Sequence, residues 1–203
     1  MLANGIAIYG GHDNTVTDNS IADIVASGGG LHVGNRFKAV ALSGTTTLAR
    51  NELNRCGCLD MNWKFGVGAI WFYALDSAMD GNIIVADTVI RDSPYNAFGV
   101  IGKKVSDLAI SNVSVDGVGT FVVDLQCGGG GRFSDVRASG IGFHAIYSCG
   151  TPFDLEDGGG NTGWLDACES AKDCALHNDT LGQCTKQRPY CTHCGWPPEP
   201  HNM

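Results

Sequence analysis

The stretch Ser27-Gly28-Gly29-Gly30-Leu31-His32-Val33-Gly34-Asn35-Arg36-Phe37 joins a glycine turn to a short strand. Side chains alternate along such a strand, so Leu31 and Val33 face one side while His32 and Gly34 face the other. A strand that is apolar behind and polar in front belongs to a larger sheet. The spacing of similar strands elsewhere in the chain indicates which kind of sheet this is.

The same kind of strand recurs about every two dozen residues. From Ile6, the matching apolar positions are Leu31, Ile70, Phe98, Val123 and Ile146, in steps of 25, 39, 28, 25 and 23. A second series consists of apolar pairs five residues apart: Val16 and Ile21, Leu48 and Leu53, Ile84 and Val89, and Leu108 and Val113. Inside these pairs the same place is held by Asn19, Asn51, Asp87 and Ser111. A fixed period with short strands and polar turn residues is typical of a solenoid.

These repeats predict an all-β fold, a right-handed single-stranded parallel β-helix with about six coils. One coil is too short to bury its own apolar side, so coils stack with their strands ~4.8 Å apart. A β-sandwich is the alternative, but its hairpin signals are mostly missing. We expect coils over residues 1–150 and an irregular, Cys-rich C-terminal cap and tail over 151–203. The 39-residue step holds extra residues in 38–45 and 56–65, which we expect to form loops of a binding face.

Composition narrows the choice of partners. A chain of 203 residues is long enough for one domain with a core, and its net charge of −8 comes without any basic cluster. Nucleic acid and membrane are therefore poor partners, and no apolar run approaches the ~20 residues that span a bilayer. Nine cysteines predict an oxidising compartment, yet no signal peptide follows Met1. We reconcile the two by expecting the chain to begin inside a longer protein.

Three motifs carry a family resemblance. They are Ala3–Asn14, Gly28–Phe37 and, most specifically, Leu59–Asp76, with weaker agreement from Asp92 to Trp164. The chain resembles the bacterial mycodextranase and α-1,3-glucanase family of glycoside hydrolases. The resemblance implies a pectate-lyase-like β-helix, inverting hydrolysis of α-1,3-glucan, a polysaccharide partner and no cofactor.

One departure from that family concerns its catalytic aspartates. The family carries an Asp and an Asp-Asp pair on coils before the segment that matches Ala3–Asn14, and this chain has no such pair in that context. Inverting hydrolysis needs two carboxyls ~6.5–9.5 Å apart, so we assign no catalytic residue and expect this chain alone to be inactive. Upstream coils of the same parent protein would then complete the enzyme. The alternatives are a non-catalytic polysaccharide-binding or structural module, or a partner chain that pairs with an open N-terminal edge.

The candidate substrate-binding residues combine rings with polar groups. Sugar C–H faces stack on aromatic rings, while sugar hydroxyls need polar neighbours. Alternation places Trp71 and Tyr73 on one side of their strand, with Ile70 and Phe72 in the core. By resemblance to β-helix polysaccharide hydrolases, the coil after the first forms a cleft edge; a polar turn that satisfies its own backbone is the alternative there. The predicted set is Asn4, Tyr9, His32, Asn35, Arg36, Asn62, Trp63, Trp71, Tyr73 and Asp76.

The tail cysteines allow two interpretations. Cys191-Thr192-His193-Cys194, with further Cys and His nearby, fits a zinc site, but we favour disulfides and predict no metal. By family-like context we pair Cys149 with Cys194, leaving Cys168, Cys174, Cys184 and Cys191 to pair among themselves. Cys127 and Cys149 are 22 residues apart, near one coil, and form an alternative pair. Cysteine content and resemblance together predict a secreted, extracellular protein.

Overall fold

The computed structural model describes residues 4–24, 28–35, 37–57, 67–75, 77–142, 144–148 and 153–165, without the side chains of Lys38, Cys127, His144 and Ser148. Its elements in chain order are β1 (Ile6–Ile8), β2 (Gly11–His12), β3 (Thr15–Thr17), β4 (Ser20–Ala22), β5 (Leu31–Gly34), the 3-10 helix η1 (Lys38–Val40), β6 (Leu42–Ser43), β7 (Thr45–Ala49), β8 (Glu52–Asn54), β9 (Gly68–Ala74), β10 (Asn82–Ser93), β11 (Asn96–Val118), β12 (Phe121–Ile141), β13 (His144–Ser148) and β14 (Phe153–Asp157). None of the helical turns in this part of the chain is long and apolar enough to cross a membrane.

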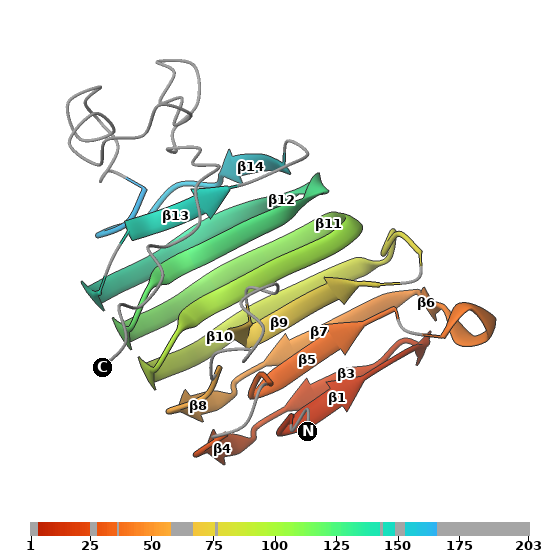
Figure 1. Cartoon of the computed structure of the whole chain (residues 1–203), viewed down its shortest axis with the longest axis horizontal. Helices are drawn as coiled ribbons and strands as arrows, with labels where there is room; N and C mark the ends of the chain where they lie inside the picture. The colour runs from red at the N-terminus through yellow and green to blue at the C-terminus, as the bar shows by residue number, and fades with distance from the viewer. Residues whose placement is uncertain are drawn as a thin grey trace, which may run out of the picture.

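The strands stack as a parallel β-helix, which confirms the predicted fold class. Every ladder between described strands is parallel. One sheet of 12 strands and a two-stranded sheet, β2 with β6, contain all of them. Figure 1 shows the strands as successive rungs, from β1, β3 and β4 at one end to β13 and β14 at the other.

The stack continues beyond residue 150, where the sequence analysis ends the coils. Strand β14 pairs with β12, and an isolated parallel bridge joins Arg137 to Thr162. The sixth coil therefore runs from β13 to at least residue 162, because these later residues still pair with the fifth coil. Residues 166–203 of the predicted cap lie outside the described residues.

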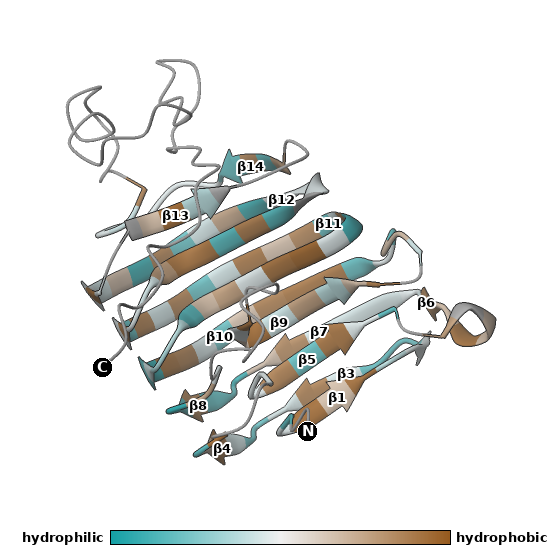
Figure 2. Ribbon diagram, in the orientation of Figure 1, coloured by the Kyte–Doolittle hydropathy of each residue, from teal (hydrophilic) through white to brown (hydrophobic). Residues whose placement is uncertain are grey.

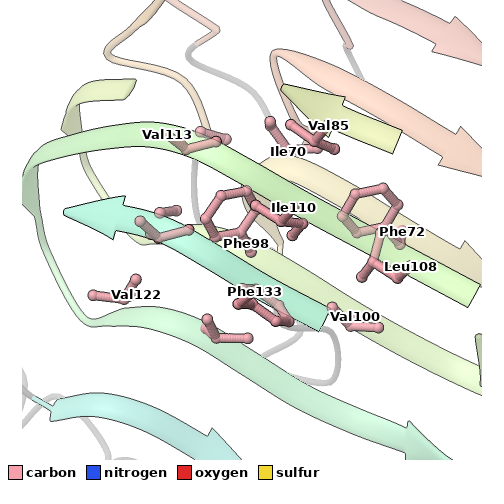
Figure 3. Packing of buried hydrophobic residues seen from close by; sticks show 14 of the residues in the cluster. Ile70, Phe72, Val85, Phe98, Val100, Leu108, Ile110, Val113, Val122 and Phe133 are labelled. Atoms are coloured by element: carbon pink, nitrogen blue, oxygen red, sulfur yellow. The ribbon is translucent and has the colours of Figure 1, made fainter. Parts of the chain in front are cut away.

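A column of apolar side chains runs through the interior of all six coils. The register pairs successive members of the predicted series, namely Ile6, Leu31, Ile70, Phe98, Val123 and Ile146. Ile70 and Phe98 are fully buried, and Leu31 is 1% exposed. Figure 3 shows Ile70, Phe98 and Phe133 among the side chains that fill this interior, and Figure 2 shows the alternation of apolar and polar residues along β11 and β12. The first predicted series is confirmed.

The second predicted series is correct for two coils and wrong for the next two. Val16 pairs with Leu48, and Ile21 pairs with Leu53, as predicted. The partners that follow are not Ile84 and Val89 but Val85 and Ile90, and then Ile110 and Val115 in place of Leu108 and Val113. In β10 the three residues 83–85 are all apolar, so their hydropathy does not reveal which of them face inward. The ladder to β7 sets the register, and a slip of one residue reverses every side chain.

The corners between strands form columns of their own. Asp87 is predicted to align with Asn19 and Asn51. In the structure Asp87 aligns with Arg50, and Thr88 is the residue that aligns with Asn51. The corner residues have left-handed backbone conformations, with φ between 49° and 80°, although few of them are glycine. One column contains Asp18, Arg50, Asp87, Asn112 and Asp135, and another contains Asp23, Arg55, Asp92, Gly117 and Gly140. Asp and Asn tolerate this conformation better than most residues, which explains their frequency at the turns.

Gly129 and Gly159 provide a test of how tightly the coils stack. Both have positive φ, but a methyl group at Gly129 would overlap the Val105 carbonyl oxygen, whereas nothing lies within 4 Å of the same position at Gly159. We expect Gly129→Ala to lower the free energy of unfolding by about 2–3 kcal/mol, through overpacking as well as backbone strain. Gly159→Ala should cost about 1 kcal/mol from strain alone. Urea denaturation measures both, and equal costs would contradict the close stacking of β12 on β11.

Candidate functional site

The outer face of the sheet β1-β5-β9-β11-β12-β13 brings several predicted site residues into one column. Side chains next to the buried apolar column point outward, because inward and outward positions alternate. The outward column in register is Ala7, His32, Trp71, Gly99, Asp124 and Tyr147. His32 and Trp71 are therefore direct neighbours on adjacent coils, and Asp124 lies two coils beyond Trp71.

Five rings from the first three coils form a cluster, which we call the aromatic cluster: Tyr9, His32, Phe37, Trp71 and Tyr73. The His32 and Trp71 rings stack with centroids 4.2 Å apart, and Trp71 and Tyr73 stack at 5.2 Å. Tyr9 meets His32 edge-on at 5.1 Å and Phe37 edge-on at 6.2 Å. Such geometries stabilise aromatic pairs beyond simple burial. The predicted residues Tyr9, His32, Trp71 and Tyr73 thus lie together.

The members of the aromatic cluster differ in accessibility. His32 and Trp71 are 4% and 2% exposed, whereas Phe37 is 51% exposed. Tyr9 and Tyr73 are half-buried. The other two exposed large apolar residues of the described chain, Val40 and Leu75, also follow the carboxyl ends of β5 and β9. A ligand can therefore reach the cluster at these strand ends, where Trp71 forms the floor and is not itself an exposed platform.

Two asparagines of the predicted set support this region from opposite ends of the strands. Asn4 accepts a hydrogen bond at Oδ1 from the Gly29 amide at 2.9 Å and donates from Nδ2 to the Tyr9 hydroxyl at 3.2 Å. Asn35 is 2% exposed and donates from Nδ2 to Ser77 Oγ at 2.5 Å and to the Ala78 carbonyl at 2.9 Å. Asn4 therefore orients Tyr9, and Asn35 fixes the turn that follows β9. Arg36, Asn62, Trp63 and Asp76, also predicted, lie outside the described residues.

Asp124 is a buried carboxyl on the same outward column. It is 1% exposed, and its oxygens accept hydrogen bonds from Asn96 Nδ2 at 3.2 Å and from Gln126 Nε2 at 3.0 and 3.1 Å. Asn96 Oδ1 is in turn held by the Thr120 hydroxyl at 2.5 Å. Burial raises the pKa of Asp124 to about 7, against the opposing effect of the two amide donors. The partners of this carboxyl are amides, which makes the network a satisfied polar cluster in the wall of the sheet.

A separate groove of about 430 Å³ lies over β10, β11, β12 and β14. Its lining includes Asp107, Gly130, Arg132 and Asp154. Arg132 forms an ion pair with Glu156, which also lines the groove. Among the described residues, none of those predicted to bind substrate lines this groove.

The described part of the chain offers no group of three or more His, Cys, Asp or Glu side chains that could hold a metal ion. Its cysteine Cys56 is a buried free thiol, and burial raises the pKa of that thiol. The predicted disulfide partners Cys149, Cys168, Cys174, Cys184, Cys191 and Cys194, and the Cys/His residues of the zinc alternative, lie outside the described residues.

The comparisons with known proteins place this site in a family context. No protein-family model and no curated protein matches the chain. The crystal structure of the catalytic unit of the thermostable GH87 α-1,3-glucanase from Streptomyces thermodiastaticus strain HF3-3 matches with 38% identity, a TM-score of 0.74 and 80% of this chain covered. The chain is related to the GH87 α-1,3-glucanases. It spans 33% of the length of that glucanase chain.

This relationship confirms the α-1,3-glucanase resemblance carried by the three sequence motifs. It also extends to sequence, since 38% identity accompanies the shared backbone. Two residues of the region described above, Phe37 and Asp124, are not among the site residues predicted from sequence. The sequence around Phe37 has no pattern that marks it as a site residue. Asp124 could have been singled out, because it is a charged residue inside the otherwise apolar run 121–125.

Proposed function

We propose that the chain binds an α-glucan at the aromatic cluster and supplies part of the substrate cleft of a glycoside hydrolase, without hydrolysing the glucan by itself. The observation that carries the proposal is the set of stacked rings with an exposed edge at Phe37, in a relative of α-1,3-glucanases. Pyranose rings expose C–H faces that pack on aromatic rings, and exposed aromatic patches on soluble proteins are commonly binding sites.

The roles of the individual groups follow from their exposure. Phe37, Tyr9 and Tyr73 offer accessible ring surface. Trp71 and His32 hold that surface in place from beneath, since both are almost fully buried and stacked on each other. The Tyr9 hydroxyl and the Asn4 amide, 3.2 Å apart, provide polar groups for sugar hydroxyls beside the rings.

Our proposal that this chain does not hydrolyse glucan by itself rests on the geometry that the inverting reaction requires. A general acid and a general base must flank the scissile bond at ~6.5–9.5 Å. Asp124 has the raised pKa of a potential acid, but it is buried and bonded to amides, not paired with a second carboxyl. In the family that this chain resembles, the catalytic acids lie on coils before the segment that matches Ala3–Asn14. An extracellular location fits a polymeric substrate and the predicted disulfides.

Isothermal titration calorimetry with α-1,3-glucan oligosaccharides tests the binding. We expect Phe37→Ala to weaken affinity about fivefold, as loss of a stacking contact of ~1 kcal/mol would. Val40→Ala, which removes exposed apolar surface at the same edge but no ring, serves as the matched control and should change affinity less than twofold.

Two other results would reject parts of the proposal. Release of reducing sugar from α-1,3-glucan by the purified chain would show that it carries a complete active site. Failure of the wild-type chain to bind any oligosaccharide would favour the structural-module alternative over both the hydrolase part and a non-catalytic binding module.

A further inference from the structure

Within the described residues, the apolar core of the solenoid is least buried at one end. We call the outer surface of the first coil, formed by β1, β3 and β4, the end face (lower right in Figure 1). Its inward residues Ile6, Ile8, Val16 and Ile21 are only partly buried. Their partners one coil later, Leu31, Val33, Leu48 and Leu53, are 0–1% exposed. At the opposite end the core residues of the sixth coil, Ile146, Phe153, Leu155 and Trp164, are 0–4% exposed.

Asn19, on the end face, occupies the same place in its coil as Asn51 and Asn161, whose side chains bind the preceding coil. Asn51 donates from Nδ2 to the Val16 carbonyl at 3.0 Å, and its Oδ1 accepts from the Asn19 amide at 3.1 Å. Asn161 makes the same pair of bonds to Phe133 O at 2.8 Å and Val136 N at 3.0 Å. Each side chain thus bridges the left-handed corner of the coil before it.

Asn19 is the counterpart of Asn51 in the first coil. Its Nδ2 donates to the Thr17 carbonyl at 2.8 Å and to Asn51 Oδ1 at 3.0 Å. Its Oδ1 accepts no hydrogen bond from the described residues. The side chain that would bridge the corner of a preceding coil is therefore present on the end face, with its acceptor available.

The two corner residues of the end face, Asp18 and Asp23, are acidic. Each begins a corner column in which acidic and basic residues alternate over the first three coils. Arg50 donates to both carboxylate oxygens of Asp18 at 2.7 Å, and Asp87 on its other side also raises the pKa of Arg50. Arg55 is paired in the same way with Asp23, at 2.6 and 2.8 Å, and its pKa is likewise raised. Asp18 and Asp23 are about 60% and 58% exposed in their side chains. The alternation acid, base, acid stops at Asp18 and Asp23.

We propose that the end face docks one further parallel β-helix coil whose two corner residues, five positions apart, are Arg or Lys. Apolar residues two positions before each corner would cover Val16 and Ile21, because these lie two positions before Asp18 and Asp23. Leu48-Ala49-Arg50-Asn51-Glu52-Leu53-Asn54-Arg55 is an example of such a sequence within this chain. Charge complementarity favours a basic-cornered coil over a second copy of this face, whose own corners are acidic.

A peptide with the sequence of residues 42–55 is the probe, and the same peptide with aspartate at both arginine positions is its control. In fluorescence anisotropy we expect the basic peptide to bind the full chain about tenfold more tightly than the control peptide. The basic peptide gains two ion pairs, whereas the control peptide meets two repulsions. The basic peptide should also slow hydrogen exchange of β3 and β4, the strands whose partners in the next coil have the sequence of the peptide. The double variant Asp18→Lys/Asp23→Lys should reverse the preference, whereas Asp135→Lys, in the same corner column on the fifth coil, should leave it unchanged.

The opposite results would overturn the proposal. Equal affinity for the two peptides would show that the corner charges do not contribute to binding. Unchanged exchange of the first-coil strands at saturating peptide would show that the end face is not the site. A dimer of the chain in sedimentation experiments that protects these strands without peptide would assign the face to self-association.

Discussion

Replacing Phe98 by alanine is expected to lower the free energy of unfolding by about 3–5 kcal/mol, the largest single-residue effect that we predict in the core. The Phe98 side chain is fully buried between Ile70 and Val123 of the adjacent coils and meets Phe133 edge-on, with ring centroids 6.2 Å apart. Backbone ladders on both sides hold the neighbouring strands in place. The structure therefore cannot close the cavity that the missing ring leaves, and both the transfer and the cavity contributions are lost.

Equilibrium urea denaturation measures this change, with Phe37→Ala as the control. Phe37 is 51% exposed, so its removal should alter stability by no more than about 0.5 kcal/mol. Since each coil contacts only its neighbours, hydrogen exchange should rise first in β9, β11 and β12, which surround the cavity. A cost below about 1 kcal/mol for Phe98→Ala would mean that the coils can shift to fill the space.

The interior column could be predicted from sequence because several of its strands alternate clearly and the others recur at nearly the same spacing. Leu31 is flanked by Gly30 and His32, and Ile70 and Phe72 alternate with Trp71 and Tyr73, so the inward residues are unambiguous. The corners could not be predicted in this way. Their residues include Asp87 and Arg50, whose positive φ follows from stacking on the coils beside them and not from a glycine.

The outer face illustrates a second limit of sequence patterns. Alternation places Trp71 outward, and an outward side chain is expected to be accessible. The ring is instead 2% exposed, because His32 from the adjacent coil and Tyr73 from the same strand stack against it. The contact with His32 joins residues 39 positions apart, and its geometry depends on the length of the intervening loop. Periodicity predicts the direction of a side chain but not what another coil places over it.

Asp124 gives the second large prediction, a pH dependence of stability. Burial raises its pKa from 3.8, the ordinary value of an aspartate side chain, to about 7 in the folded protein, so the folded state holds a proton that the unfolded state releases between these values. Stability should therefore fall as pH rises from about 4 to about 7 and stay level above that. A shift of roughly three units corresponds to ~4 kcal/mol, an upper value for a buried group.

Asp124→Asn removes the ionisation while keeping the shape of the side chain. The asparagine Oδ1 can accept from Asn96 Nδ2, and a flipped Gln126 amide can accept from its Nδ2, so the network remains satisfied. In urea denaturation at pH 4 the variant and wild type should be nearly equally stable, and at pH 8 the variant should be more stable by several kcal/mol. Asp18→Asn is the control of opposite sign. Hydrogen bonding from Arg50 lowers the pKa of Asp18, so its stabilisation is present above about pH 4 and is lost as pH falls. A constant difference between Asp124→Asn and wild type from pH 4 to pH 8 would show that the buried carboxyl does not change its ionisation on folding.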